Sequence, residues 1–87
     1  MHVISRKRLL EAATRHSVLS APLDAWYRIA KKCEWRSMEE LRNVISSADA
    51  VGKYVVFNIK GNTFRLISEV NFKTGRIYIR HVLTHAE

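Results

Sequence analysis

The sequence predicts a single α+β domain over residues 1–87, with helices packed on one face of an antiparallel sheet. Apolar residues recur at helical spacing as far as about residue 45. From residue 54 onward, the pattern changes to short β-rich runs separated by glycine-containing turns. A chain of 87 residues has room for one modest core, which excludes a doubly wound sheet or a full barrel enzyme.

The N-terminal segment predicts a short strand followed by a helix. His2, Val3 and Ile4 form the expected opening strand. Ser5 is a suitable N-cap residue, because a serine hydroxyl can accept a hydrogen bond from a free amide of the first helical turn. The helix is expected to continue to about residue 16. Its expected buried residues are Leu9, Leu10 and Ala13.

Two further helices are expected before the sheet. Pro22 stands at a natural helix start, and the second helix is predicted over residues 23–33. Ser37 and Glu40 have the spacing of a capping box, which predicts a third helix after Ser37. Residues 46–52 are expected to form a loop. The apolar residues at helical spacing are Trp26, Ile29, Ala30 and Cys33 in the second helix, and Met38, Leu41 and Ile45 in the third.

Three strands are predicted at the C-terminal end, over Tyr54–Ile59, residues 63–72 and residues 76–83. The dipeptide Gly61-Asn62 predicts a tight hairpin turn between the first two. This turn sets Ile59 opposite Phe64, Asn58 opposite Arg65, and Phe57 opposite Leu66. The resulting core face is expected to hold Val55, Phe57, Ile59, Phe64, Leu66, Val70 and Phe72.

The register of the second hairpin depends on its loop. A four-residue loop over residues 73–76 sets Glu69 opposite Arg80 and Arg65 opposite Thr84. The core face then gains Ile77, Ile79, His81 and Leu83. The polar face gains Tyr78, Arg80, Val82 and Thr84.

Positive charge is concentrated at the two ends of the chain. The formal net charge is +7, with +3 in residues 1–16, zero in residues 17–50 and +4 in residues 51–87. Such a balance favours an anionic partner. If the first helix and the sheet meet in space, their cations form one basic face.

The polar sheet face is the candidate functional surface. It gathers Asn58, Lys60, Arg65 and Arg80, with Tyr78 as an aromatic neighbour. Cations beside an aromatic ring suit RNA, whose phosphates need positive partners and whose unpaired bases stack on rings. The alternative interpretation is an ordinary solvated sheet face, whose charge is partly balanced by Glu69.

The histidine residues near the C-terminal end bear on two kinds of chemistry, proton transfer and metal binding. His81 falls on the core side of the predicted register, so packing is its expected role. His85 lies beyond the apolar run and is the better candidate for proton transfer. Neither a metal site nor a cofactor is expected, because the sequence has no cluster of ligands at metal-binding spacing.

The single Cys33 excludes an internal disulfide and suits a reducing compartment. No secretory signal or run of about 18 apolar residues is present in the sequence, so a cytoplasmic protein without a membrane role is expected.

Two segments of the sheet resemble the HigB-like toxins of type II toxin–antitoxin systems, which have the RelE-like fold. The first runs from Phe57 through Gly61-Asn62 to Ile67, and the second runs from Ile77 to Glu87. Trp35, followed by Ser37 and a short helix, also fits the family. In relatives the closing Thr-His-Ala-Glu is commonly followed by a tyrosine, whereas this sequence ends at Glu87.

The resemblance implies a metal-independent mRNA interferase that cuts mRNA, often on the translating ribosome, and so inhibits translation. It also implies a neutralising HigA-like antitoxin with a helix-turn-helix DNA-binding domain. In such toxins the 2′-hydroxyl attacks the adjacent phosphate and leaves a cyclic phosphate. The implied catalytic residues are Arg65, His85, Lys60 and Asn58. The residues expected to bind RNA are Arg80, Tyr78, Arg76 and Lys53.

Two other functions fit the charge pattern. A non-catalytic RNA-binding module would use the same basic, aromatic sheet without cutting RNA. A protein-interaction domain would use it to bind an acidic partner and would have no affinity for RNA.

Overall fold

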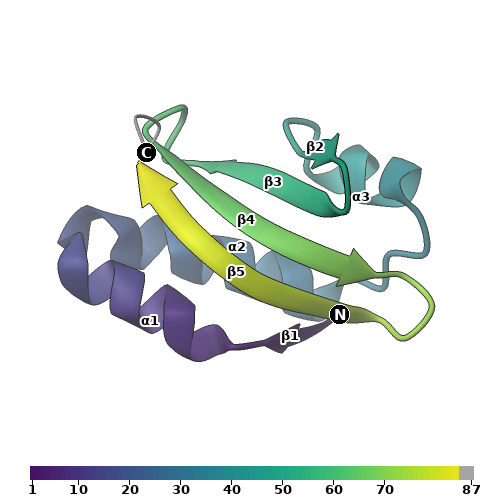
Figure 1. The fold of residues 1–87 in the computed structure, drawn as a ribbon, viewed down its shortest axis with the longest axis horizontal. Coiled ribbons are helices and arrows are strands. Elements are labelled where there is room, and N and C mark those ends of the chain that lie inside the picture. Colours follow the sequence, from purple (N-terminus) through teal and green to yellow (C-terminus); the bar gives the residue numbers. More distant parts are fainter. Residues whose placement is uncertain (85–87) are drawn as a thin grey trace.

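The computed structural model describes residues 1–84, and Figure 1 shows their arrangement. The strands and helices alternate little along the chain, because all three α-helices precede the four C-terminal strands. In chain order, the elements are β1 (His2–Ile4), α1 (Arg6–Arg15), a 3₁₀ turn η1 (Ser17–Leu19), α2 (Ser20–Lys32), α3 (Met38–Val44), β2 (Asp49–Val51), β3 (Tyr54–Ile59), β4 (Phe64–Asn71) and β5 (Arg76–Thr84).

The sheet has five strands in the order β1-β5-β4-β3-β2. β1 runs parallel to β5, and the other neighbours are antiparallel. The predicted α+β class, the opening strand and the three C-terminal strands are confirmed. The prediction of a loop over residues 46–52 was wrong, because Asp49–Val51 forms an edge strand against β3.

Helix α1 begins without the expected cap. Ser5 adopts a left-handed conformation with φ 69°, and its side chain makes no capping hydrogen bond. The buried stripe of the helix consists of Leu9 and Ala12, which are three residues apart. Leu10, expected in the core, is 57% exposed, because the helix is rotated toward Ala12 rather than toward Ala13.

Helix α2 begins three residues earlier than predicted and places Pro22 in its first turn. Trp26 and Ala30 are buried, and the ring of Trp26 meets that of Phe57 edge-on at a centroid distance of 5.2 Å. Ile29 does not share this burial and is 39% exposed. In α3, the Ser37 hydroxyl accepts a hydrogen bond from the Glu40 amide at 3.2 Å, as one half of the predicted capping box requires.

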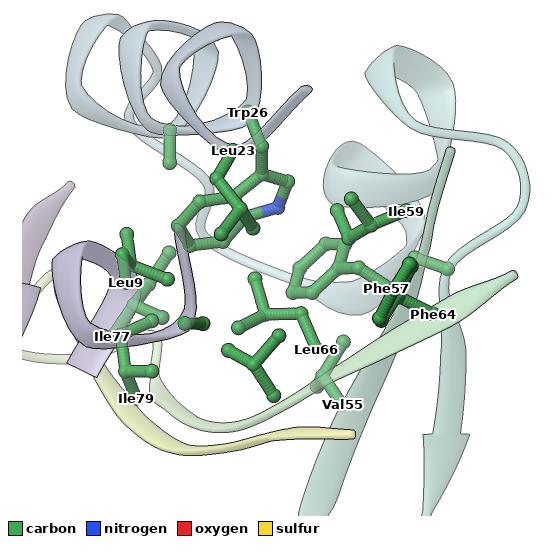
Figure 2. Packing of buried hydrophobic residues seen from close by; sticks show 14 of the residues in the cluster. Leu9, Leu23, Trp26, Val55, Phe57, Ile59, Phe64, Leu66, Ile77 and Ile79 are labelled. Carbon is green, nitrogen blue, oxygen red and sulfur yellow. The ribbon is translucent and has the colours of Figure 1, made fainter. Parts of the chain in front are cut away.

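The core lies between the helices and one face of the sheet, as Figure 2 shows around Leu9, Trp26, Phe57, Leu66 and Ile77. Figure 1 shows α1 and α2 on the same side of the sheet. In β3, buried residues alternate with half-buried ones, so every second side chain faces the helices. The opposite face of the central strands therefore carries the half-buried side chains, both polar and apolar.

The β3–β4 hairpin has the predicted register throughout, with Phe57 opposite Leu66 and Asn58 opposite Arg65. The turn is closed by a hydrogen bond from the Thr63 amide to the Lys60 carbonyl oxygen at 3.3 Å. The alternating pattern of apolar residues was therefore sufficient to assign both faces of these two strands.

The predicted register of the β4–β5 hairpin was wrong. Glu69 lies opposite Tyr78 rather than Arg80, and the register shifts between Ile67 and Ser68. Ser68 pairs with Ile79 and Ile67 pairs with His81, so Arg80 is the extra residue of a β-bulge.

The bulge also reverses the predicted faces of the last residues of β5. His81 is exposed, whereas Val82 is only 9% exposed and belongs to the core. Thr84 lies opposite Phe64, and Arg65 lies opposite Leu83 instead of Thr84. His81 and Leu83 thus leave the core face to which the sequence pattern assigned them.

Candidate nucleic-acid interface

The face of the sheet opposite the helices is called here the open face. It is organised as cross-strand rows, because residues that oppose each other on neighbouring strands project to the same side. The first row consists of Asn58, Arg65 and Leu83 on β3, β4 and β5. All three side chains are half-buried. The row places an amide and a guanidinium directly opposite each other, a combination that can bind a phosphate oxygen.

The second row holds Val56, Ile67 and His81. Val56 and Ile67 are half-buried and give an apolar surface in the middle of the face, while His81 is exposed. His81 and Arg65 are diagonal neighbours on adjacent strands, a relation that in sheets corresponds to about 7–8 Å between backbone positions. An imidazole therefore stands within side-chain reach of the arginine.

The third row holds Tyr54, Glu69 and Tyr78, and two cations converge on its carboxylate. Arg80 Nε lies 3.2 Å from Glu69 Oε1, and Lys53 Nζ lies 3.8 Å from the same oxygen. The Arg80 guanidinium also lies over the Tyr78 ring at 5.2 Å. Ion pairs as exposed as these contribute little to stability, so their main effect is to orient the three side chains.

The remaining sequence-predicted site residues lie around these rows. Lys60 is exposed in the β3–β4 turn, two residues beyond Asn58. Arg76 is exposed at the start of β5 and lies opposite Asn71. The structure thus brings Asn58 and Arg65 together and gathers Lys53, Tyr78 and Arg80 at the other end of the face. His85 lies outside the described residues.

The first helix and the sheet meet, which is the condition under which their cations form one basic face. Arg8 of α1 donates a hydrogen bond to the Arg80 carbonyl oxygen at 2.6 Å. A hollow of about 160 Å³ lies at this junction. Its lining residues are Arg8, Glu11, Arg15, Arg80, His81, Val82 and Leu83. Arg8 and Arg15 therefore extend the positive charge of the open face around the edge of β5.

Sequence reasoning missed His81 as a residue of the open face. An uninterrupted alternation sets Ile77, Ile79, His81 and Leu83 on one face, and this regular pattern concealed the bulge. The signal that could have revealed it is Val82, an apolar residue that the regular register placed on the polar face. Glu69 was recognised only as a charge that balances its neighbours, although the structure makes it the centre of the third row.

Comparison with known proteins identifies the family. Residues 19–87 match the HigB toxin family, described as the RelE-like toxic component of a toxin–antitoxin system. This segment covers the whole of the sheet except β1. The chain belongs to the HigB toxin family. The α+β fold is consistent with the RelE-like type that the family model describes.

Curated relatives of this HigB-family chain match it along its whole length. The mRNA interferase toxin HigB of Escherichia coli K12 is 34% identical over 90 residues, which cover 100% of this chain and 86% of the relative. The mRNA interferase HigB of Escherichia coli O6:H1 is 30% identical over 90 residues, covering 100% and 87%. The mRNA interferase HigB of Shigella flexneri has the same 34% identity and 86% coverage as the K12 protein.

Among residues 1–84, no group of three or more histidine, cysteine, aspartate or glutamate side chains is placed to hold a metal ion. Within the same residues, no helix combines the length and the apolar character needed to cross a membrane.

Proposed function

We propose that this chain is an mRNA interferase, an endoribonuclease that cuts mRNA and thereby inhibits translation. Its membership of the HigB family carries the proposal, together with relatives of that name that match the full chain. The open face supports it, because Arg65 and Asn58 are opposed there with Lys60 in the adjoining turn. A cytoplasmic location follows from a substrate that is mRNA.

The proposed reaction uses the 2′-hydroxyl of the RNA as nucleophile. Its oxygen forms a bond to the adjacent phosphorus, and the bond from phosphorus to the 5′-oxygen breaks, which gives a cyclic phosphate and a new 5′-hydroxyl. One proton leaves the 2′-hydroxyl, and one proton is delivered to the departing 5′-oxygen. The chemistry needs no metal ion, since the substrate supplies the nucleophile and side chains supply the cations and the proton transfer.

Each proposed catalytic residue has a defined task. Arg65 stabilises the negative charge that develops on the phosphorane oxygens, and Lys60 adds a second cation at the turn. Asn58 donates a hydrogen bond that positions the phosphate beside Arg65. His85 transfers a proton, and His81 contributes an imidazole to the open face. Lys53, Arg76, Tyr78 and Arg80 bind the flanking RNA.

Expression of the chain in bacteria under an inducible promoter tests the proposal directly. Growth arrest with depletion of mRNA is expected, and Arg65→Ala is expected to slow cleavage by about 100-fold or more. Arg36→Ala, which removes an exposed cation preceding α3, is the matched control and is expected to retain cleavage. Intact mRNA combined with salt-sensitive RNA binding would contradict the proposal and favour a non-catalytic RNA-binding module. Equal toxicity of Arg65→Ala and the parent would contradict the site.

The partners of the toxin are also part of the proposal. We infer that cleavage occurs on translating ribosomes and that a HigA-like antitoxin with a helix-turn-helix domain neutralises the chain. An acidic segment of such an antitoxin suits the cationic open face. Cleavage of free mRNA and of ribosome-bound mRNA should be compared with the purified protein. Co-expression with a helix-turn-helix protein from the neighbouring gene should restore growth and give a co-purifying complex.

A further inference from the structure

The third row of the open face places one carboxylate between two aromatic rings. Glu69 on β4 lies opposite Tyr54 on β3 and opposite Tyr78 on β5. Opposed residues in antiparallel strands have their Cβ atoms about 4.5–5.5 Å apart, so a ring flanks the acid on each side. The Glu69 side chain is 29% exposed, and both tyrosines are half-buried. The row is therefore a partly desolvated surface with an acceptor at its centre.

The cations of the third row hold the Glu69 carboxylate in place without using all of its hydrogen-bond acceptor capacity. Arg80 and Lys53 both approach Oε1, at 3.2 and 3.8 Å. Each cation also lies over a neighbouring ring, Lys53 over Tyr54 at 5.3 Å and Arg80 over Tyr78 at 5.2 Å. An ionised carboxylate offers about four lone-pair sites, so two contacts leave capacity for further donors.

A hollow of about 420 Å³ lies beside this row, a volume within the range of small-ligand sites. It sits where β4 extends beyond the start of β3 toward the β4–β5 turn. Its lining residues are Lys53, Glu69, Val70, Asn71, Phe72, Lys73 and Tyr78. The acceptor, an aromatic ring and two lysines therefore border one space.

An acid at one end of a cationic face suits a ligand that offers hydrogen-bond donors. A phosphate would be repelled by the carboxylate, so the third row is poorly suited to the RNA backbone. An unpaired base suits it better, because single-stranded RNA is recognised by stacking on aromatic rings and by hydrogen bonds to the base edge. Guanine presents two adjacent N–H donors on its pairing edge, whereas adenine, cytosine and uracil each place an acceptor beside a donor.

We propose that Glu69 and Tyr78 form a base-recognition subsite that prefers guanine. Glu69 accepts hydrogen bonds from the two adjacent N–H groups of the base, and the Tyr78 ring stacks on it. Lys53 and Arg80 hold the carboxylate and balance its charge. Arg65 and Glu69 are four residues apart on β4, which corresponds to about 13 Å, so the recognised base flanks the scissile phosphate at a fixed position. This inference rests on the proposed function and adds its sequence preference.

Mapping of cut sites in total RNA tests the subsite during catalysis. The wild-type protein is expected to cut with guanine enriched at one fixed position beside the cleaved bond. Glu69→Gln is expected to lower this enrichment by about tenfold and to favour adenine, because a carboxamide matches the donor and acceptor of that base. Glu39→Gln, an exposed glutamate of α3, is the matched control and should retain the guanine preference.

A binding measurement tests the subsite independently of cleavage. Fluorescence titration with short adenine-rich RNA oligonucleotides, with and without a single guanine, should show about tenfold tighter wild-type binding of the guanine-containing strand. Glu69→Gln should abolish the difference. Unchanged base composition around the cut in Glu69→Gln, or equal affinities for the two strands, would overturn the subsite and leave Glu69 as a counter-ion. A guanine preference in binding without any cleavage would overturn the proposed function instead.

Discussion

The two hairpins of the sheet share strand β4 but differ in regularity. β3 and β4 pair residue for residue from Tyr54 to Ile59, whereas the pairing of β4 with β5 shifts between Ile67 and Ser68. In the regular hairpin every second residue belongs to the core. In the bulged hairpin Arg80 interrupts the alternation, and His81 moves to the open face. Bulges occur beside functional sites because an extra residue redirects the side chains that follow it.

In the regular hairpin we expect the largest difference in stability between variants of two neighbouring residues. Phe57 is fully buried against Trp26, while the adjacent Asn58 is half-buried on the open face. Phe57→Ala is expected to lower the free energy of unfolding by about 3–5 kcal/mol, because it removes a ring and leaves a cavity. Asn58→Ala should lower it by about 0.5 kcal/mol or less. Urea unfolding measures both, and similar losses would contradict the alternation of faces.

In the bulged hairpin we expect the order of the stability losses at positions 81 and 82 to be the reverse of the order that an uninterrupted alternation predicts. Val82 is 9% exposed, and His81 before it is exposed. Val82→Ala should therefore lower the free energy of unfolding by about 2 kcal/mol. His81→Ala should change it by about 0.5 kcal/mol or less. A larger loss of stability for His81→Ala than for Val82→Ala would contradict the bulge and favour the regular register. Denaturant midpoints of the two variants decide between them.

The contrast between the hairpins explains how far the sequence predicts this molecule. The fold class and the first hairpin follow from apolar periodicity and from one turn dipeptide. The bulge does not follow, because the residues from Ile77 to Leu83 alternate well in either register. β2 also escaped prediction, since all three of its residues are exposed and carry no core pattern. A strand that is held only by backbone pairing to its neighbour has no alternating pattern of apolar residues from which it could be predicted.

The candidate site also has a part that the sequence predicts, in the regular hairpin, and a part that it does not, in the bulged hairpin. Asn58 and Arg65 could be placed opposite each other from the sequence, because the regular hairpin fixes them. The β5 partners of Glu69 depend on the bulged hairpin, so the sequence places Tyr78 and Arg80 on the open face but in the wrong register. A binding surface that spans both hairpins therefore needs the structure for its detailed geometry, although its residue types are visible in the sequence.

Ser68 gives a smaller test, at the position of β4 where the regular and the shifted pairing meet. This serine stands where the register shifts, is fully buried and donates a hydrogen bond from its hydroxyl to the Val55 carbonyl oxygen at 2.9 Å. Ser68→Ala is expected to lower the free energy of unfolding by about 1 kcal/mol, the usual net contribution of such a bond. Ser47→Ala, at an exposed serine in a turn, is the matched control. Equal unfolding midpoints for both variants would show that this hydroxyl bond between β4 and β3 does not stabilise the sheet.

The turns of the two hairpins give the smallest effect and connect stability to catalysis. The regular hairpin has two left-handed residues, Lys60 with φ 54° and Gly61 with φ 63°, whereas the second turn has Gly75 alone, with φ 70°. A side chain in this region costs about 1 kcal/mol, and the greater freedom of glycine in the unfolded chain offsets part of any relief. Lys60→Gly should therefore raise the free energy of unfolding by about 0.5 kcal/mol, while Lys60→Ala should give no gain.

Both Lys60 variants should cut mRNA more slowly than the parent, because each removes the proposed cation of the turn. A more stable but less active Lys60→Gly protein would show that the first hairpin retains a strained lysine for its charge. Urea unfolding and single-turnover cleavage of the same preparations separate the two effects. Full cleavage by the glycine variant would remove Lys60 from the proposed site and leave the regular hairpin with Asn58 and Arg65 as its proposed catalytic residues.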